Sequence, residues 1–295
     1  MALPVTAFSA AGNRLFDEAA GIRQLSTGYC FTEGPVWDAA LRCLYFTDFQ
    51  ENRIYRWDSQ SGVTLYRTDS NRAVGLFLDA EGRIVSAETR SHGVAYADER
   101  TSTLIVGDYQ GKQLNSPNDV VVSTSGDIFF TDPYSTAMGE PRVLDINGVY
   151  GVSPGGEARL VCDDMERPNG LAFSPDESVL YVNDTNRQHI LAFRARADGS
   201  FSRIGVFATM DTAYGPGAPD GMKVDTAGNV YVTGPGGIWA LAPDGSPLVL
   251  LQCPEFVGNL CFGGDDGRTL FLTASTSVYA LNVHIPGVLP HRKEG

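Results

Sequence analysis

The sequence predicts an all-β fold, a six-bladed β-propeller. Six segments share one pattern, in which a small residue is followed by a short apolar strand, a turn rich in Asp and Gly, and a second strand of β-branched and aromatic residues. A third short strand follows most of these pairs, and segments of helical periodicity are nearly absent. The residues that precede the small residues are separated by 41, 44, 51, 51 and 38 positions. This spacing is typical of four-stranded propeller blades.

The six repeats cover most of the chain in order. Their turns contain Asp-Gly, Gly-Asp and Gly-Asn pairs, which favour hairpins because these residues accept positive φ angles. A β-sandwich or two stacked β-domains is the alternative fold, and six repeats in phase disfavour it. The repeats are "TEGPVWDAALRCLYFTDF" (32–49), "AVGLFLDAEGRIVSAETR" (73–90), "SPNDVVVSTSGDIFFTDP" (116–133), "RPNGLAFSPDESVLYVNDT" (167–185), "APDGMKVDTAGNVYVTGP" (218–235) and "FVGNLCFGGDDGRTLFLTAS" (256–275).

The last repeat lacks room for a fourth strand before the C-terminal tail. The stretch "GIRQLST" (21–27) is predicted to supply that strand and to close the ring. We therefore expect an N-terminal extension over 1–20, a single propeller domain over 21–285 and a C-terminal tail over 286–295.

A ring of polar residues is predicted at the axis, because the first strand of each propeller blade is the innermost. The residues that precede the six small residues, called the anchor ring below, are Glu33, Val74, Asn118, Asn169, Asp220 and Gly258. Two carboxylates and two amides thus converge from four blades. Such oxygen donors suit Ca²⁺, Mg²⁺ or Mn²⁺, and Zn²⁺ less well. A divalent cation would also relieve the repulsion between the two carboxylates.

A second ring is expected where the second strands end. Its members are Asp48, Glu88, Asp132, Asp184, Gly234 and Thr273. For Asp48 and Asp184 we favour a role as turn caps that accept backbone N–H groups. For Asp132, which precedes Pro133 and Tyr134, a cap and a contact with substrate are both open. His92 is the one group near the site that titrates at neutral pH.

Composition excludes several classes of partner. The chain of 295 residues has a net charge of −13 and a pI near 4.7, which argues against binding nucleic acid or an anionic membrane surface. No apolar run is long enough to span a membrane, and the N-terminus does not resemble a signal peptide. Five scattered cysteines are typical of a reduced, cytoplasmic protein.

The combined motifs resemble the senescence marker protein/gluconolactonase/regucalcin family, in its gluconolactonase-like branch. The similarity extends from about residue 20 to 285 and is carried by "EGPVW", "SPNDVVV", "GDIFFTDP", "RPNGLAFSPD", "PDGMKVD", "GNVYVTGPGGIW" and "NLCFGGDDGRTLFLTAS". The resemblance implies a six-bladed propeller with one divalent cation in the channel, and lactone hydrolysis. Its metal ligands fall on Glu33, Asn169 and Asp220, and Asn118 corresponds to the Asn that contacts the substrate or the metal.

The expected function is therefore that of a metal-dependent lactonase of the gluconolactonase type, acting on a small-molecule sugar lactone. Asp220 is the candidate general base and Asn118 orients the substrate, with Asp132, Tyr134 and His92 as further substrate contacts. Calcium is the first expectation for the cation, with Mg²⁺, Mn²⁺ or Zn²⁺ as alternatives, and the protein is expected to be a monomer or homodimer. The loop "RSHGV" (90–94) is shorter than in the gluconolactonase-like branch, which leaves the substrate open.

Two other functions compete with this one. The same metal site could serve a phosphotriesterase-like enzyme or a promiscuous lactonase and esterase. From a different class, the chain could be a non-catalytic cation-binding propeller, although a scaffold does not require four polar residues on one axis. The segments 134–142 and 211–219 are predicted rim loops that select the substrate.

Overall fold

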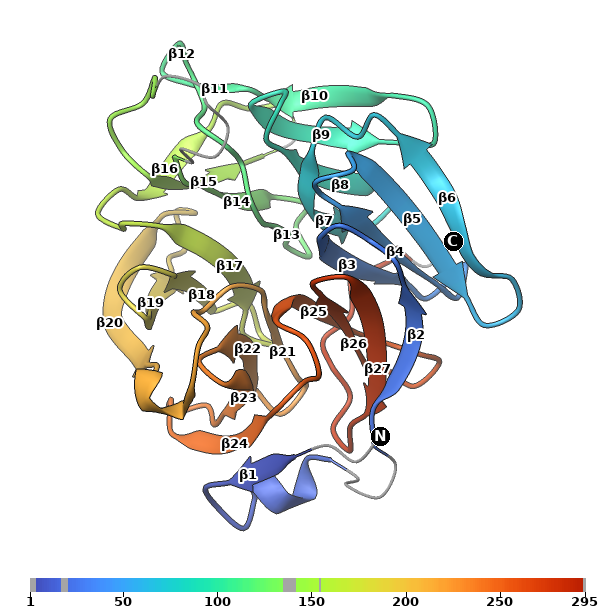
Figure 1. Cartoon of the computed structure of the whole chain (residues 1–295). Coiled ribbons are helices and arrows are strands. Elements are labelled where there is room, and N and C mark those ends of the chain that lie inside the picture. Colours follow the sequence, from blue (N-terminus) through green and yellow to red (C-terminus); the bar gives the residue numbers. More distant parts are fainter. Residues whose placement is uncertain (1–3, 17–20, 135–141, 154, 294–295) are drawn as a thin grey trace.

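The computed structural model describes residues 4–16, 21–134, 142–153 and 155–293, and it confirms the six-bladed propeller (Figure 1). The strands of each blade pair antiparallel in chain order. Blades 1 to 3 contain β3 (Thr32–Asp38), β4 (Cys43–Asp48), β5 (Arg53–Asp58) and β6 (Gly62–Thr68); β7 (Ala73–Leu78), β8 (Ile84–Glu88), β9 (Gly93–Ala97) and β10 (Ser102–Val106); and β13 (Val120–Val122), β14 (Ile128–Asp132), β15 (Gly148–Val152) and β16 (Arg159–Cys162).

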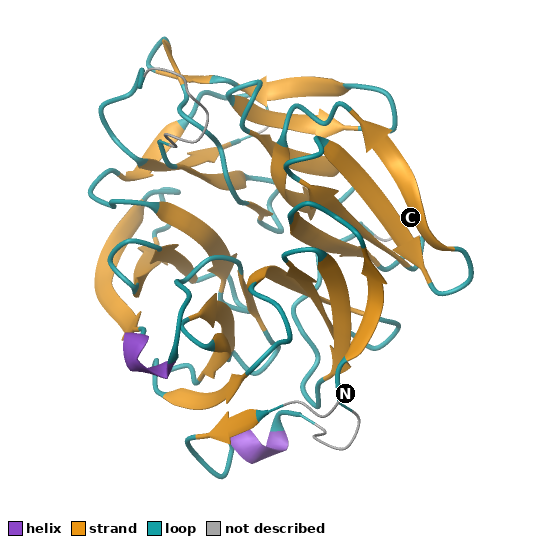
Figure 2. Ribbon diagram, viewed as in Figure 1, coloured by secondary structure: helices purple, strands orange, loops and turns teal. Residues whose placement is uncertain are grey.

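The remaining blades follow the same order, with additions from the N-terminus. Blades 4 to 6 contain β17 (Pro168–Phe173), β18 (Val179–Asp184), β19 (His189–Ala195) and β20 (Phe201–Thr209); β21 (Met222–Val224), β22 (Val230–Gly234), β23 (Gly237–Leu241) and β24 (Pro247–Leu251), with β1 (Val5–Ala7); and β25 (Val257–Gly263), β26 (Thr269–Ala274) and β27 (Ser277–Asn282), with β2 (Arg23–Thr27). Outside the blades lie the hairpin β11 (Asp108–Tyr109) and β12 (Lys112–Gln113), and the 3-10 helices η1 (Gly12–Arg14) and η3 (Thr212–Tyr214). Figure 2 shows how little of the chain is helical. Within the described ranges, no helix is long and apolar enough to cross a membrane.

The first strands of neighbouring blades contact one another around the whole ring, from β3 through β7, β13, β17 and β21 to β25 and back to β3. Backbone hydrogen bonds join some of these strands directly. The N–H of Gly75 donates to the Asn118 carbonyl at 2.8 Å, and the N–H of Gly170 donates to the Asp220 carbonyl at 3.1 Å. The anchor ring therefore lies on the innermost strands, or in the case of Asn118 and Asp220 two residues before them.

Strand β2 closes the ring. It pairs antiparallel with β27, with Thr27 opposite Ser277, so the N-terminal strand completes blade 6 as the sequence predicted (Figure 1). Apolar packing seals the same junction, because Trp37 of blade 1 stacks on Phe271 of blade 6 with ring centroids 5.3 Å apart.

The described parts of both terminal segments pack against the propeller. Strand β1 pairs with β24 as a fifth strand of blade 5, and Phe8 stacks on Trp239 with ring centroids 5.3 Å apart. At the other terminus, the N–H of Val288 donates to the Val224 carbonyl at 2.9 Å. Arg292 forms an ion pair of 2.6 Å with the buried Asp38. The two ends of the chain thereby fasten blades that are distant in sequence.

Candidate functional site

The four polar members of the anchor ring line one cavity of about 200 Å³ at the end of the channel where the first strands begin. The structure therefore brings Glu33, Asn118, Asn169 and Asp220 together, as the repeat spacing predicted. Val74, a fifth member of the ring, lines the same cavity. The other lining residues are Phe31, Phe49, Thr89, Ser116, Pro133 and Arg167.

Glu33 is held in a fixed orientation by its neighbours. Its Oε2 accepts the N–H of Gly34 at 2.8 Å and the side-chain Nδ2 of Asn259 at 3.0 Å. Gly258, the sixth ring position, leaves the space that the glutamate needs, because a Cβ there would lie 2.6 Å from its Oε1. Only 4% of Glu33 is exposed.

Asp220 and Asn169 are held through their own blades and each other. The N–H of Asp220 donates to Thr233 Oγ1 at 3.1 Å, which fixes the start of the strand that follows. Nδ2 of Asn169 donates to Thr185 Oγ1 at 3.1 Å, and the Asn169 amide also lowers the pKa of Asp220 by hydrogen bonding. Carboxylate and amide are thus neighbours at the cavity.

Burial and neighbouring carboxylates disfavour the charged forms of both Glu33 and Asp220. Burial raises the pKa of Glu33 well above its usual range, and the nearby Asp220 raises it further. Burial likewise raises the pKa of Asp220 to about 7, although Arg167 opposes the shift. Two negative charges in one poorly hydrated place call for a compensating cation. The donor set fits a hard divalent cation, because every candidate ligand offers an oxygen atom. Among the described residues, no group of three or more His, Cys, Asp or Glu could hold a metal ion, so the amides are needed to complete such a set.

Three carboxylates of the second ring act through the backbone. Asp48 accepts the N–H groups of Cys30 at 2.9 Å and Phe31 at 3.1 Å, so its predicted role as a cap is confirmed. Asp184 does the same for Arg167, at 3.1 Å.

Asp132 belongs to the same set of caps. It accepts the N–H groups of Asn115 at 2.8 Å and Ser116 at 2.7 Å. Asp132 is fully buried, and burial raises its pKa to about 7. It is not among the residues that line the cavity. Asp132 therefore acts as a cap in this structure and has no exposed surface for the predicted substrate contact.

Two further predicted contacts also lie outside the cavity lining. The ring Nδ1 of His92 is 2.5 Å from the Asn115 carbonyl oxygen, which directs the imidazole at the backbone. The N–H of Tyr134 donates to Asn147 Oδ1 at 2.9 Å. Most of the predicted rim loop that begins at Tyr134 lies outside the described residues. The substrate contacts of His92 and Tyr134 stay predictions.

Sequence reasoning missed several residues of the cavity wall. Arg167 is exposed and is the only cationic side chain among the described residues of the lining, and it stands two positions before Asn169. Phe31 and Phe49 supply aromatic surface. Their position in the sequence could have indicated them, because each lies within two positions of a member of one of the two rings, as Ser116 does before Asn118.

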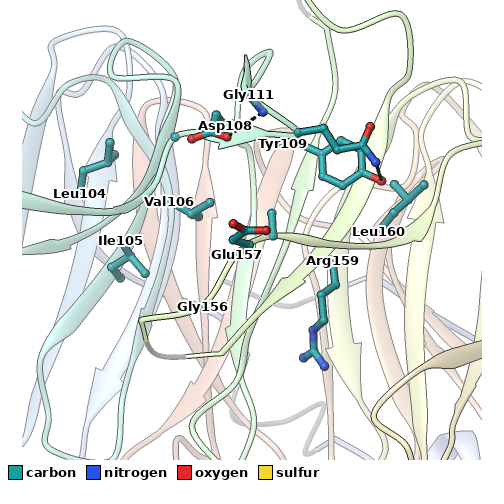
Figure 3. Close-up of a pocket in the computed structure, with 13 residues that line it drawn as sticks. Leu104, Ile105, Val106, Asp108, Tyr109, Gly111, Gly156, Glu157, Arg159 and Leu160 are labelled. Atoms are coloured by element: carbon teal, nitrogen blue, oxygen red, sulfur yellow. Dashed lines mark hydrogen bonds between the residues drawn. The ribbon is translucent and has the colours of Figure 1, made fainter.

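A larger cavity, of about 700 Å³, lies at the outside of the propeller (Figure 3). It is lined by residues of the outer strands β10 and β16, of β11 and of the turn that follows β11. Figure 3 shows Leu104 and Val106 on one side of it and Glu157 and Arg159 on the other. No member of the anchor ring reaches this cavity, so its size does not make it the candidate site.

Comparison with known proteins agrees with this geometry. Residues 31–276 match the family described as the SMP-30/Gluconolactonase/LRE-like region. A gluconolactonase of Zymomonas mobilis is 32% identical, over 93% of this chain and 84% of that protein. The pentonolactonase XacC of Haloferax volcanii is 28% identical, over 86% and 84% of the two chains.

Solved structures show the same architecture. XC5397 of Xanthomonas campestris, described as a gluconolactonase, superimposes with a TM-score of 0.87 and 31% identity, covering 95% of each chain. A regucalcin of Agrobacterium tumefaciens shares the fold at 20% identity, with a TM-score of 0.76 over 92% of this chain and 97% of that one.

We expect Asp132→Ala to lower the free energy of unfolding by about 3 kcal/mol, because two buried N–H groups lose a charged acceptor. Urea denaturation followed by tryptophan fluorescence measures this. Asp198→Ala is the control, since Asp198 caps an exposed turn through Ser200 at 2.9 Å and its removal should cost much less. Equal stability losses in the two variants would contradict the role assigned to Asp132.

Proposed function

The chain belongs to the SMP-30/gluconolactonase/LRE-like family, and on this premise we propose that it is a lactonase that opens the ester ring of a sugar lactone. The convergence of Glu33, Asn118, Asn169 and Asp220 on one cavity carries the proposal. Relatives named as a gluconolactonase and a pentonolactonase support a lactone of a sugar acid as the substrate. The five free cysteines support a reducing compartment, the cytoplasm.

The proposed cofactor is one divalent cation, bound by Glu33, Asn169 and Asp220 with Asn118 close by. Calcium is expected first because all the donors are oxygen atoms and none is a histidine or cysteine. When bound, such an ion polarises the lactone carbonyl and stabilises the negative charge that develops on its oxygen.

In the proposed reaction, water attacks the carbonyl carbon and the ester C–O bond of the ring breaks. Asp220 takes a proton from the attacking water and then gives it to the ring oxygen, which leaves as a hydroxyl group. Asp220 suits this role better than Glu33 does. Oε2 of Glu33 is already engaged by two donors, whereas Asp220 is only partly buried and opens to the cavity.

The walls of the cavity match the two sides of a sugar lactone. Phe31, Phe49, Val74 and Pro133 form an apolar wall against which the C–H face of the ring can pack. Thr89, Ser116 and Arg167 offer polar groups for hydroxyl oxygens. In this proposal Asn118 orients the substrate from the floor of the cavity.

The deciding experiment is a hydrolysis screen with a pH indicator, run with and without a chelator. Aldonolactones, simple lactones, aryl esters and a phosphotriester are the substrates, and uncatalysed hydrolysis is subtracted. We expect acid release from an aldonolactone that stops with the chelator and returns when Ca²⁺ or Mn²⁺ is added. Preferential turnover of the phosphotriester would favour the phosphotriesterase-like alternative. Cation binding without any turnover would favour the non-catalytic one.

We expect Asp220→Asn to reduce lactone turnover at saturating cation by about 100-fold or more, the usual cost of losing a general base. Asn118→Ala should reduce it less, by about tenfold, because water can replace part of a neutral hydrogen-bonding contact. Initial rates of both variants, measured at several cation concentrations, separate weak cation binding from a chemical defect. Near-parent turnover by Asp220→Asn would place the base elsewhere.

A further inference from the structure

The residue that follows each member of the anchor ring lies one step deeper in the channel. In order around the ring these residues are Gly34, Gly75, Asp119, Gly170, Gly221 and Asn259. Four are glycines, and the two with long side chains belong to blades 3 and 6, which stand opposite each other in a ring of six. Beneath the candidate site there is thus a second layer with only two polar side chains, neither of which the proposed function uses.

The glycines leave the space that these two side chains fill. A Cβ on Gly75 would lie 2.4 Å from Asp119 Oδ1, and a Cβ on Gly221 would lie 2.1 Å from Asn259 Oδ1. Asp119 is 2% exposed and Asn259 is 3% exposed. Burial raises the pKa of the Asp119 carboxyl, while Lys223 and the Asn259 amide oppose the shift. Both side chains therefore fill buried space that the glycines leave beneath the candidate site.

The orientation of the Asn259 amide is determined by its own strand. Its Oδ1 accepts the N–H of Leu260 at 2.8 Å, so its Nδ2 is directed at Glu33 Oε2, at 3.0 Å. A flipped amide would set an oxygen against the Glu33 carboxylate and an amino group against the Leu260 N–H, two repulsive contacts. A donor from blade 6 thus faces a carboxylate from blade 1.

We propose that Asn259 is a positioning residue that fixes Glu33 for cation binding. This inference rests on the proposed function for the presence of the cation. Two donors from different strands, the N–H of Gly34 and Nδ2 of Asn259, hold one oxygen of Glu33. Asn259 thereby orients the carboxylate plane before any ligand arrives. Removing such a partner of a metal ligand typically reduces cation affinity by 10- to 100-fold.

The test compares Asn259→Leu with the parent by titration calorimetry, with CaCl₂ and then MnCl₂ as the probe. Leucine has the branching and the number of side-chain heavy atoms of asparagine, and it removes the donor. We expect cation affinity to fall by at least tenfold, with lactone turnover recovering at high cation concentration. Glu33→Gln is the positive control, since it removes a proposed ligand charge.

Asn229→Leu is the matched control. Asn229 is also a buried asparagine, and its Nδ2 donates to a carboxylate, Asp225 Oδ2, at 2.7 Å, but neither residue lines the candidate cavity. This variant should lose thermal stability and keep parental cation affinity. If Asn259→Leu does not fold, Asn259→Ser replaces it, because a serine hydroxyl can still serve the Leu260 N–H but is too short to reach Glu33.

Each outcome of these measurements tests the role of Asn259 or the proposed function. Parental cation affinity in Asn259→Leu or Asn259→Ser, equal losses of affinity in Asn229→Leu and the Asn259 variant, or a parent that binds neither cation would overturn the inference. A parent that binds the cation but opens no lactone would refute the proposed function instead. The affinity comparison would then still decide whether Asn259 positions Glu33.

Discussion

The burial of two carboxylates at one end of a narrow channel is the constraint on which the rest of the site depends. Burial disfavours the charged forms of Glu33 and Asp220, and the nearby Asp220 disfavours that of Glu33 further. Hydrogen-bond donors and a positive charge from the surrounding residues offset part of the free-energy cost of burying these charges. Asn259 and the Gly34 N–H hold Glu33, and Arg167 favours the charged form of Asp220. What the protein alone leaves uncompensated is the charge that we assign to a divalent cation.

The same constraint explains why ring closure matters for the site. Glu33 lies in the first blade and Asn259 in the last, 226 residues apart in sequence, and their hydrogen bond crosses the junction between those blades. That junction is sealed by the pairing of β2 with β27 and by the stacking of Trp37 on Phe271. A weak seal would let blades 1 and 6 move apart and separate the two side chains. Stability at the seam and geometry at the axis are therefore coupled.

Periodicity made the fold and the anchor ring predictable, since repeats in phase place equivalent residues at equivalent radii. It could not show which side chains cross the axis. Asn259 follows Gly258, an anchor-ring member without a side chain. Its partner Glu33 is apparent only when blades 1 and 6 are brought together. The sequence leaves two roles open for Asp132 because it does not show burial. The sequence does not predict Arg167 at the cavity, because nothing local distinguishes it from the arginines elsewhere on the surface.

The anchor ring and the second ring have different roles at the cavity. The anchor ring provides the polar groups at the floor, while the caps of the second ring arrange the walls without touching the cavity themselves. Asp48 holds the N–H of Phe31, Asp132 holds that of Ser116, and Asp184 holds that of Arg167. Each of these three held residues lines the cavity, as do Phe49, Thr89 and Pro133, which directly follow second-ring residues. The walls can therefore vary in side chain while their backbone stays fixed, so one propeller can keep its chemistry and change the lactone that it accepts.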